Sequence, residues 1–178
     1  VSTTNPAEGT KCVTITGDGT ERQITRAASY GDGIFYVSLR SNDNVGSDGT
    51  DRFIFKIITD AAYTGSATQV QLNSTGAGKI VYRYNNGTSY GTLIASFTAN
   101  QWYRFGFEID STNKKFKINV DDGSWTDWIN YDITGAGNGE VSRLDLECGS
   151  GLNGEAAFDY ISPNYVESAA TNTSNFFS

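Results

Sequence analysis

The stretch that decides the fold runs from Gln101 to Asp110 and reads QWYRFGFEID. Every second residue carries a large apolar side chain: Tyr103, Phe105, Phe107 and Ile109. Because successive side chains of a strand point to opposite faces, this pattern predicts a strand with one face in a core and one toward solvent. The next run, from Lys115 to Asp121, repeats the alternation, which is typical of antiparallel sheets.

The same alternation recurs along the chain, while no window holds a helical apolar pattern for three turns. Turn sequences that tolerate positive φ separate the runs, for example at 85–87 and 121–123. The predicted strands are 12–16, 23–27, 33–41, 52–59, 68–72, 79–84, 92–97, 101–110, 115–121, 127–133, 141–148 and 155–161. Many short strands with such turns predict an all-β chain of two stacked antiparallel sheets.

Length and composition fit one domain of this kind. The chain has 178 residues, of which 38% are hydrophobic, 13% are aromatic, 20 are Gly and only two are Pro. We expect residues 1–167 to form a single β-sandwich domain. The segment 168–178 is rich in Ala, Thr, Asn and Ser, and we expect a linker or a frayed tail there.

Charge and missing residue types exclude several functions. The net charge is −7 and the sequence has no run of Lys or Arg, which argues against nucleic acid and anionic membranes as partners. The chain contains no His, which excludes Ser-His-Asp and Cys-His catalysis and imidazole metal sites. Its two cysteines, Cys12 and Cys148, fit either a disulfide or two buried thiols.

Two pairs of carboxylates remain as catalytic candidates. Glu108 and Asp110 lie two residues apart on one predicted strand, and so do Asp145 and Glu147. Such pairs share a face at roughly 6.5–7 Å along a strand, which is within the spacing that glycosidases use. Alternating carboxylates are also common on the solvent face of any strand, and the sequence favours that ordinary interpretation.

The run 101–110, followed by KFKINVDDG at 115–123, resembles the concanavalin A-like, laminin G-like superfamily. AEGTK at 7–11 and AFDYI at 157–161 resemble the opening and closing strands of carbohydrate-binding modules with this fold. The resemblance implies a two-sheet antiparallel jelly-roll sandwich.

Two departures from the superfamily argue against catalysis. Glu-Ile-Asp at 108–110 is not followed by the second Glu of the superfamily's glucanases. The histidine of its alginate-lyase-like members is absent as well.

The resemblance also implies a binding groove on the solvent face of one curved sheet. Aromatic rings stack on the C–H face of a sugar, while Arg, Asn, Asp and Glu bond its hydroxyls. The candidate ligand-binding residues are Tyr36, Arg40, Lys56, Arg83, Trp102, Arg104, Glu108, Trp125, Trp128, Asp145 and Glu147, with Tyr131 and Arg143 as further candidates. The alternatives are cross-strand ion pairs for the charged residues and a plug at the sandwich edge for Trp102.

Calcium is the expected metal, because hard oxygen ligands are abundant and soft ligands are scarce. The resemblance implies that Glu8 and Asp159 bring the first and last strands to one structural Ca²⁺. The loop 42–51 is a second candidate, but it lacks the spacing of an EF-hand, and a solvated turn is the favoured interpretation.

These observations favour a non-catalytic carbohydrate-binding module that recognises a polysaccharide or oligosaccharide. We expect it to be extracellular and to act as a monomer within a larger modular protein. One alternative is a laminin G-like adhesion or structural domain that binds protein, which predicts a flat, aromatic-poor surface. The other is a small polysaccharide lyase or glycoside hydrolase, which predicts a cleft where catalytic groups converge.

Overall fold

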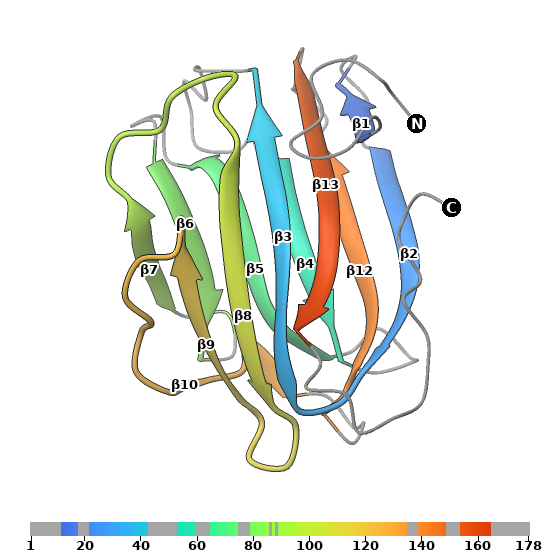
Figure 1. Ribbon diagram of the computed structural model, residues 1–178, viewed down its shortest axis with the longest axis vertical. Coiled ribbons are helices and arrows are strands. Elements are labelled where there is room, and N and C mark those ends of the chain that lie inside the picture. The colour runs from blue at the N-terminus through green and yellow to red at the C-terminus, as the bar shows by residue number, and fades with distance from the viewer. Residues whose placement is uncertain are drawn as a thin grey trace.

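A computed structural model describes residues 12–17, 22–42, 53–59, 65–74, 79–85, 87, 89–134, 139–148 and 154–164. All regular elements within these residues are strands, and they form two sheets stacked face to face (Figure 1). Every strand pairing is antiparallel. The expected two-sheet antiparallel jelly-roll sandwich is therefore confirmed.

The sheet nearer the viewer in Figure 1 is called the front sheet. Its strands lie in the order β1 (Val13–Thr16), β13 (Glu155–Asn164), β3 (Gly33–Ser41), β8 (Tyr103–Asp110), β9 (Lys115–Val120) and β10 (Ile129–Asn130). The decisive stretch thus occupies β8, near the middle of this sheet, and β9 follows it as the second strand of a hairpin.

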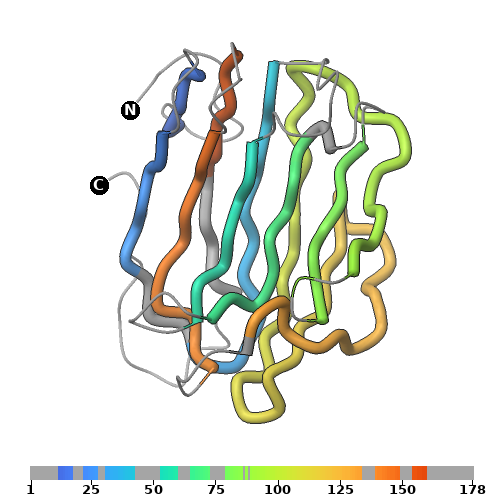
Figure 2. Tube along the Cα trace, turned by 180° about the vertical axis from the view of Figure 1, so that it is seen from behind, coloured from blue at the N-terminus to red at the C-terminus, as the bar shows by residue number. Residues whose placement is uncertain are grey.

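The back sheet faces the viewer in Figure 2. Its strands lie in the order β2 (Arg22–Tyr30), β12 (Val141–Cys148), β4 (Phe53–Ile58), β5 (Gly65–Ser74), β6 (Lys79–Tyr84) and β7 (Ser89–Ile94), and β11 (Ile133–Thr134) also pairs with β5. Strands far apart in sequence are neighbours in both sheets, so most of the pairing is long-range.

The core lies between the sheets and is made by the alternating apolar residues. Phe35 of β3 stacks on Phe107 of β8 with ring centroids 5.2 Å apart. Phe55 of β4, in the opposite sheet, meets the same Phe107 ring at 6.2 Å. All three rings are buried, and each contributes about 1.5–3 kcal/mol of burial free energy. These contacts hold the two sheets together and leave two outer faces to solvent.

The turns form where the sequence predicts them. Asn85 and Gly87 have φ values of 54° and 73°, and Asp121 and Asp122 have values of 49° and 56°. Asn, Asp and Gly adopt this left-handed region more readily than other residues do. The predicted turns at 85–87 and 121–123 are therefore confirmed.

The predicted strand 127–133 was wrong, because the chain changes sheets within it. β10 pairs with β9 in the front sheet, whereas β11 pairs with β5 in the back sheet. Tyr131 and Asp132 lie between these two strands, and both are completely buried. Tyr131 is therefore a core residue and not the ligand-binding residue that its place in the predicted loop-plus-strand stretch suggests. The predicted strand 92–97 is displaced by a few residues, because β7 spans Ser89–Ile94.

Cys12 lies beside β1 at the front sheet, and Cys148 ends β12 in the back sheet. The structure has them as two buried thiols, which is the second of the two expected arrangements. Burial, together with the charge of Asp159, raises the pKa of the Cys12 thiol. Within the described residues, no helix is long and apolar enough to cross a membrane.

Candidate functional site

The predicted ligand-binding residues lie on two opposite surfaces. The outer face of the front sheet, called the tryptophan face, holds Tyr36, Arg40, Trp102, Arg104, Glu108, Trp125 and Trp128. The outer face of the back sheet, called the polar face, holds Lys56, Arg83, Asp145 and Glu147. A single groove cannot contain both sets, because the buried core separates the two faces.

The tryptophan face repeats one arrangement, in which a carboxylate pairs with a cation that lies over an aromatic ring. The described residues form three such units: Glu155–Arg40–Trp102, Asp122–Arg104–Tyr36 and Glu108–Lys117–Trp128. Each cation–ring contact contributes about 0.5–1 kcal/mol at an exposed site. The units hold the rings in fixed positions along β3, β8 and β9.

Arg104 is at the centre of these units. Its guanidinium carbon lies 4.2 Å from the centroid of the Tyr36 ring. One Nη1 atom donates to both carboxylate oxygens of Asp122, at 2.9 and 3.0 Å. Both partners of this ion pair are well exposed, with side-chain exposures of 39% for Arg104 and 67% for Asp122. Solvent and ligand can therefore reach this unit.

The two outer units differ in exposure. Arg40 is buried, donates to Glu155 at 2.9 Å and lies 5.2 Å from the Trp102 centroid. Lys117 lies 3.3 Å from Glu108 and 4.5 Å from the Trp128 centroid. Trp128 is 41% exposed, which makes it one of the exposed large apolar residues of the described surface.

The loop 121–128 supplies two of the tryptophans and is tied to the sheet at both ends. Asp121 accepts a hydrogen bond from the Arg104 backbone N–H at 2.9 Å and donates its own N–H to the Arg104 carbonyl at 2.7 Å. Thr126 makes a similar reciprocal pair with Ile118, at 3.0 and 3.1 Å. The loop is thus a fixed part of the face.

Gly106 provides the space in which Trp125 lies. A Cβ at this position would overlap Asn119 Oδ1 and would lie 2.9 Å from Tyr36 Cε1 and 3.0 Å from Trp125 Cη2. Asn119 accepts a hydrogen bond from the Gly106 N–H at 3.0 Å and donates to the Gly123 carbonyl at 3.3 Å. Trp125 is therefore held over the middle of β8, next to Tyr36.

All three tryptophans of the chain thus lie on one outer face. The sequence did not indicate this, because Trp125 and Trp128 are separated by three positions in a predicted loop-plus-strand stretch. The loop does not alternate like a strand. Its hydrogen bonds, rather than a period of two, bring both rings to the same side.

The polar face carries a row of side chains that crosses the back sheet. The strand registers place Asp145 beside Lys56, Lys56 beside Gln69, Gln69 beside Arg83, and Arg83 beside Tyr90. Tyr90 at the end of the row is 50% exposed, whereas Gln69 and Asp145 are buried. The row is mostly polar and has one exposed ring.

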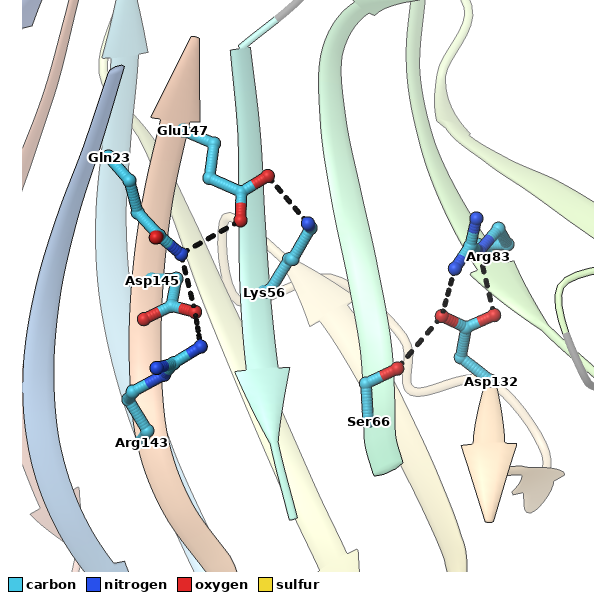
Figure 3. A network of polar contacts seen from close by, with 8 residues as sticks. All are labelled: Gln23, Lys56, Ser66, Arg83, Asp132, Arg143, Asp145 and Glu147. Carbon is cyan, nitrogen blue, oxygen red and sulfur yellow. Dashed lines mark hydrogen bonds and ion pairs between the residues drawn. The ribbon is translucent and has the colours of Figure 1, made fainter. Parts of the chain in front are cut away.

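Two clusters of polar contacts stabilise this row (Figure 3). In the first, Gln23 of β2 donates to Asp145 and Glu147 of β12, each at 2.9 Å. Lys56 of β4 lies 2.5 Å from Glu147, and Arg143 lies 2.7 Å from Asp145. The cluster links three neighbouring strands of the back sheet.

In the second cluster, Arg83 of β6 makes two hydrogen bonds to Asp132, at 2.8 and 2.9 Å, and Ser66 donates to the same carboxylate at 2.9 Å. Burial alone would lower the pKa of Arg83, but the hydrogen bonds and charge of Asp132 raise it above its ordinary value. Asp132 is completely buried. The sequence pattern does not mark Asp132 as a site residue, because alternation does not predict the change of sheet between β10 and β11.

The candidate catalytic pairs are engaged in ordinary contacts. Glu108 is paired with Lys117, and Glu147 is paired with Lys56. Asn113 donates hydrogen bonds to Asp110 through its side chain and its backbone, which lowers the pKa of Asp110. A carboxyl group that acts as a general acid at neutral pH needs a raised pKa. The pKa of Asp110 is lowered instead, which does not suit that role.

The expected calcium site is only partly within the described residues. Asp159 lies on the outer side of β13, beside Ser38 of β3, and is buried. Glu8 lies outside the described residues, as does the loop from position 43 to 51. Among the described residues, no group of three or more His, Cys, Asp or Glu side chains is arranged to hold a metal. The calcium site stays a prediction.

Comparison with known proteins shows similarity in structure alone. No protein-family model matches the sequence, and no curated protein matches it. Among solved structures, a sialidase superposes with a TM-score of 0.63 at 9% identity over 88% of this chain, but the chain spans only 15% of the sialidase.

Two smaller structures match over nearly their whole length. The carbohydrate-binding module CBM66 from Bacillus subtilis has a TM-score of 0.52 at 11% identity, covering 87% of this chain and 92% of that one. Toad ovary galectin in complex with thio-digalactose has a TM-score of 0.51 at 13% identity, covering 80% and 98%. At these identities the likeness shows the fold alone, a two-sheet jelly-roll sandwich.

Proposed function

We propose that this chain is a non-catalytic carbohydrate-binding module and that the tryptophan face contacts a polysaccharide. The observation that carries the proposal is that Trp102, Trp125 and Trp128 all lie on one outer face. The structural likeness to a carbohydrate-binding module and to a galectin supports it at the level of the fold. We also propose that the protein is extracellular.

The chemistry of the face suits a sugar. Pyranose rings present a face of C–H groups that aromatic rings contact, and an edge of hydroxyls that need polar partners. Beside the rings, Asp122 and Arg104 offer exposed acceptors and donors. Because the loop 121–128 is tied to β8 and β9, little ordering of the protein is needed when a ligand binds.

The alternative functions receive less support from the same residues. If the chain were an adhesion domain, we would expect an outer surface poor in aromatic residues. This face instead carries four aromatic rings: Tyr36, Trp102, Trp125 and Trp128. An enzyme predicts carboxyl groups poised for proton transfer. The pairing of Glu108 with Lys117 and the lowered pKa of Asp110 favour structural roles for these groups.

The test uses tryptophan emission, which reports on the tryptophan face because the polar face carries no tryptophan among its described residues. The protein is titrated with a panel of soluble polysaccharides, and affinity is measured by calorimetry with any that perturb the emission. Trp128→Ala should lower the affinity about tenfold or more, the usual loss for an aromatic anchor.

Tyr90→Ala is the matched control, because Tyr90 is the exposed ring of the polar face. It should leave the affinity unchanged. If Tyr90→Ala removes binding and Trp128→Ala does not, the site lies on the polar face. If no polysaccharide of the panel binds, the proposed function is rejected.

A further inference from the structure

We infer that the polysaccharide bound by the tryptophan face is electrically neutral, neither a polyuronate nor a polyamine. The inference rests on the proposed function and adds the class of ligand. It follows from the way the charges of this face are paired.

Three of the four described outward-facing cations of this face are already engaged in ion pairs, and the fourth, Lys115, lies opposite Asp110 in the strand register. Arg40 is bound to Glu155 at 2.9 Å, Arg104 to Asp122 at 2.9 Å, and Lys117 to Glu108 at 3.3 Å. Each of these cations also lies over a ring, within 5.2 Å of its centroid. A uronate could bind one of them only by displacing a protein carboxylate, with no net gain of ion pairs.

The surplus charge of the face also repels a polyanion. Among the described residues of this face and its loop 121–128, the acids are Glu108, Asp110, Asp121, Asp122, Asp127, Glu155 and Asp159, and the cations are Arg40, Arg104, Lys115 and Lys117. The whole chain has a net charge of −7. Like charges on ligand and protein slow association and weaken binding at low ionic strength.

The surplus of carboxylates attracts a polyamine at long range, but the contacts that would hold an ammonium group on the rings are already occupied. The rings that would attract a ligand cation already have one over them, at 4.2 Å for Tyr36 and 4.5 Å for Trp128. The carboxylates beside them are paired with the same protein cations. A neutral sugar can bind without breaking these ion pairs or cation–ring contacts, because its hydroxyls can donate to the remaining lone pairs of a paired carboxylate.

The experiment compares three soluble polymers by calorimetry and tryptophan emission: a neutral galactomannan or β-glucan series, polygalacturonate, and chitosan. Each is tested at about 0.02 M and about 0.5 M NaCl, which changes the screening length several-fold. We expect binding within the neutral series only, with an affinity that changes less than about twofold between the two salt concentrations.

A gain of function provides the second arm. Glu108→Gln releases Lys117 from its carboxylate, and this variant should acquire weak binding of polygalacturonate at low salt, seen as a change in tryptophan emission. Glu147→Gln is the matched control, because it releases Lys56 on the opposite face. With that variant, polygalacturonate should leave tryptophan emission unchanged.

The outcomes separate this inference from the proposed function. Binding of polygalacturonate or chitosan to the unaltered protein, lost in Trp128→Ala, would keep the carbohydrate site and overturn its neutral specificity. A salt dependence greater than about tenfold for a neutral polymer would overturn it too. Absence of binding to every polymer would reject the proposed function itself.

Discussion

The tryptophan face and the polar face are built with the same kind of ion pair but in different surroundings. On the tryptophan face Arg104 and Asp122 remain 39% and 67% exposed, and the guanidinium lies over a ring. On the polar face Asp132 is completely buried and receives three hydrogen bonds from Arg83 and Ser66. Burial therefore makes one pair part of the fold, whereas exposure leaves the other available to a ligand.

The largest expected effect tests this difference directly. Asp132→Ala should lower the free energy of unfolding by about 3 kcal/mol, the lower end for a broken buried pair, because the Arg83 side chain retains 22% exposure. Asp122→Ala, which breaks the exposed pair, should cost less than about 1 kcal/mol. Urea unfolding of both variants measures the two values. Equal losses would show that burial does not distinguish the two faces.

The second prediction concerns the packing under the tryptophan face. Gly106→Ala should destabilise the protein by about 1–3 kcal/mol, because the new methyl group overlaps Asn119 and displaces Trp125. Tryptophan emission should shift as the ring moves. Gly31→Ala is the control, because its Cβ would meet only Glu140 Oε1, at 4.0 Å. A Gly106→Ala protein with unchanged stability and emission would contradict the assigned position of Trp125.

The third prediction uses pH to examine the crossing between the two sheets. The Tyr131 hydroxyl donates to the Gly139 carbonyl at 2.8 Å, and Tyr131→Phe should cost about 1 kcal/mol at neutral pH. Burial, with the charges of Asp32 and Asp110, raises the pKa of Tyr131 above its ordinary value of 10.0.

The sign of this pH effect follows from the raised pKa. The folded protein keeps the Tyr131 proton while the unfolded chain loses it, so the stability that this group contributes is complete below pH 10 and declines above it. Urea unfolding across this range should show a steeper alkaline decline for the unaltered protein than for Tyr131→Phe. Parallel curves would mean that Tyr131 is accessible to solvent.

The smallest effect is the coupling of one cation to its ring. A double-mutant cycle of Lys117→Met and Trp128→Phe should give a coupling of about 0.5–1 kcal/mol, from the 4.5 Å contact between them. The corresponding cycle of Lys56 and Tyr90, which lie on different strands of the polar face without being neighbours, should give none. A coupling of zero in both cycles would contradict the cation–ring contact between Lys117 and Trp128.

Part of the tryptophan face could have been found from the sequence. β8 and β9 are joined by a short turn, which fixes their register and places Glu108 opposite Lys117. The pairing of Arg104 with Asp122 follows from the same hairpin. In these two cases the partners are close in sequence, so the hairpin alone predicts that they meet.

Other contacts could not be found in this way. Arg40 and Glu155 are separated by 115 positions and meet because β13 pairs with β3. Asp132 meets Arg83 because the chain leaves the front sheet after Asn130. Each depends on strand order, which alternation does not contain.

The sequence by itself determined the all-β class, the inward residues of the main strands and the turns, because these depend on a period of two and on residues that tolerate positive φ. The tertiary structure alone decided that the predicted ligand residues divide between two faces and that all three tryptophans share one of them. The physical reason is that alternation shows which residues of a strand share a side. It does not show which sheet the strand belongs to or which strands lie beside it.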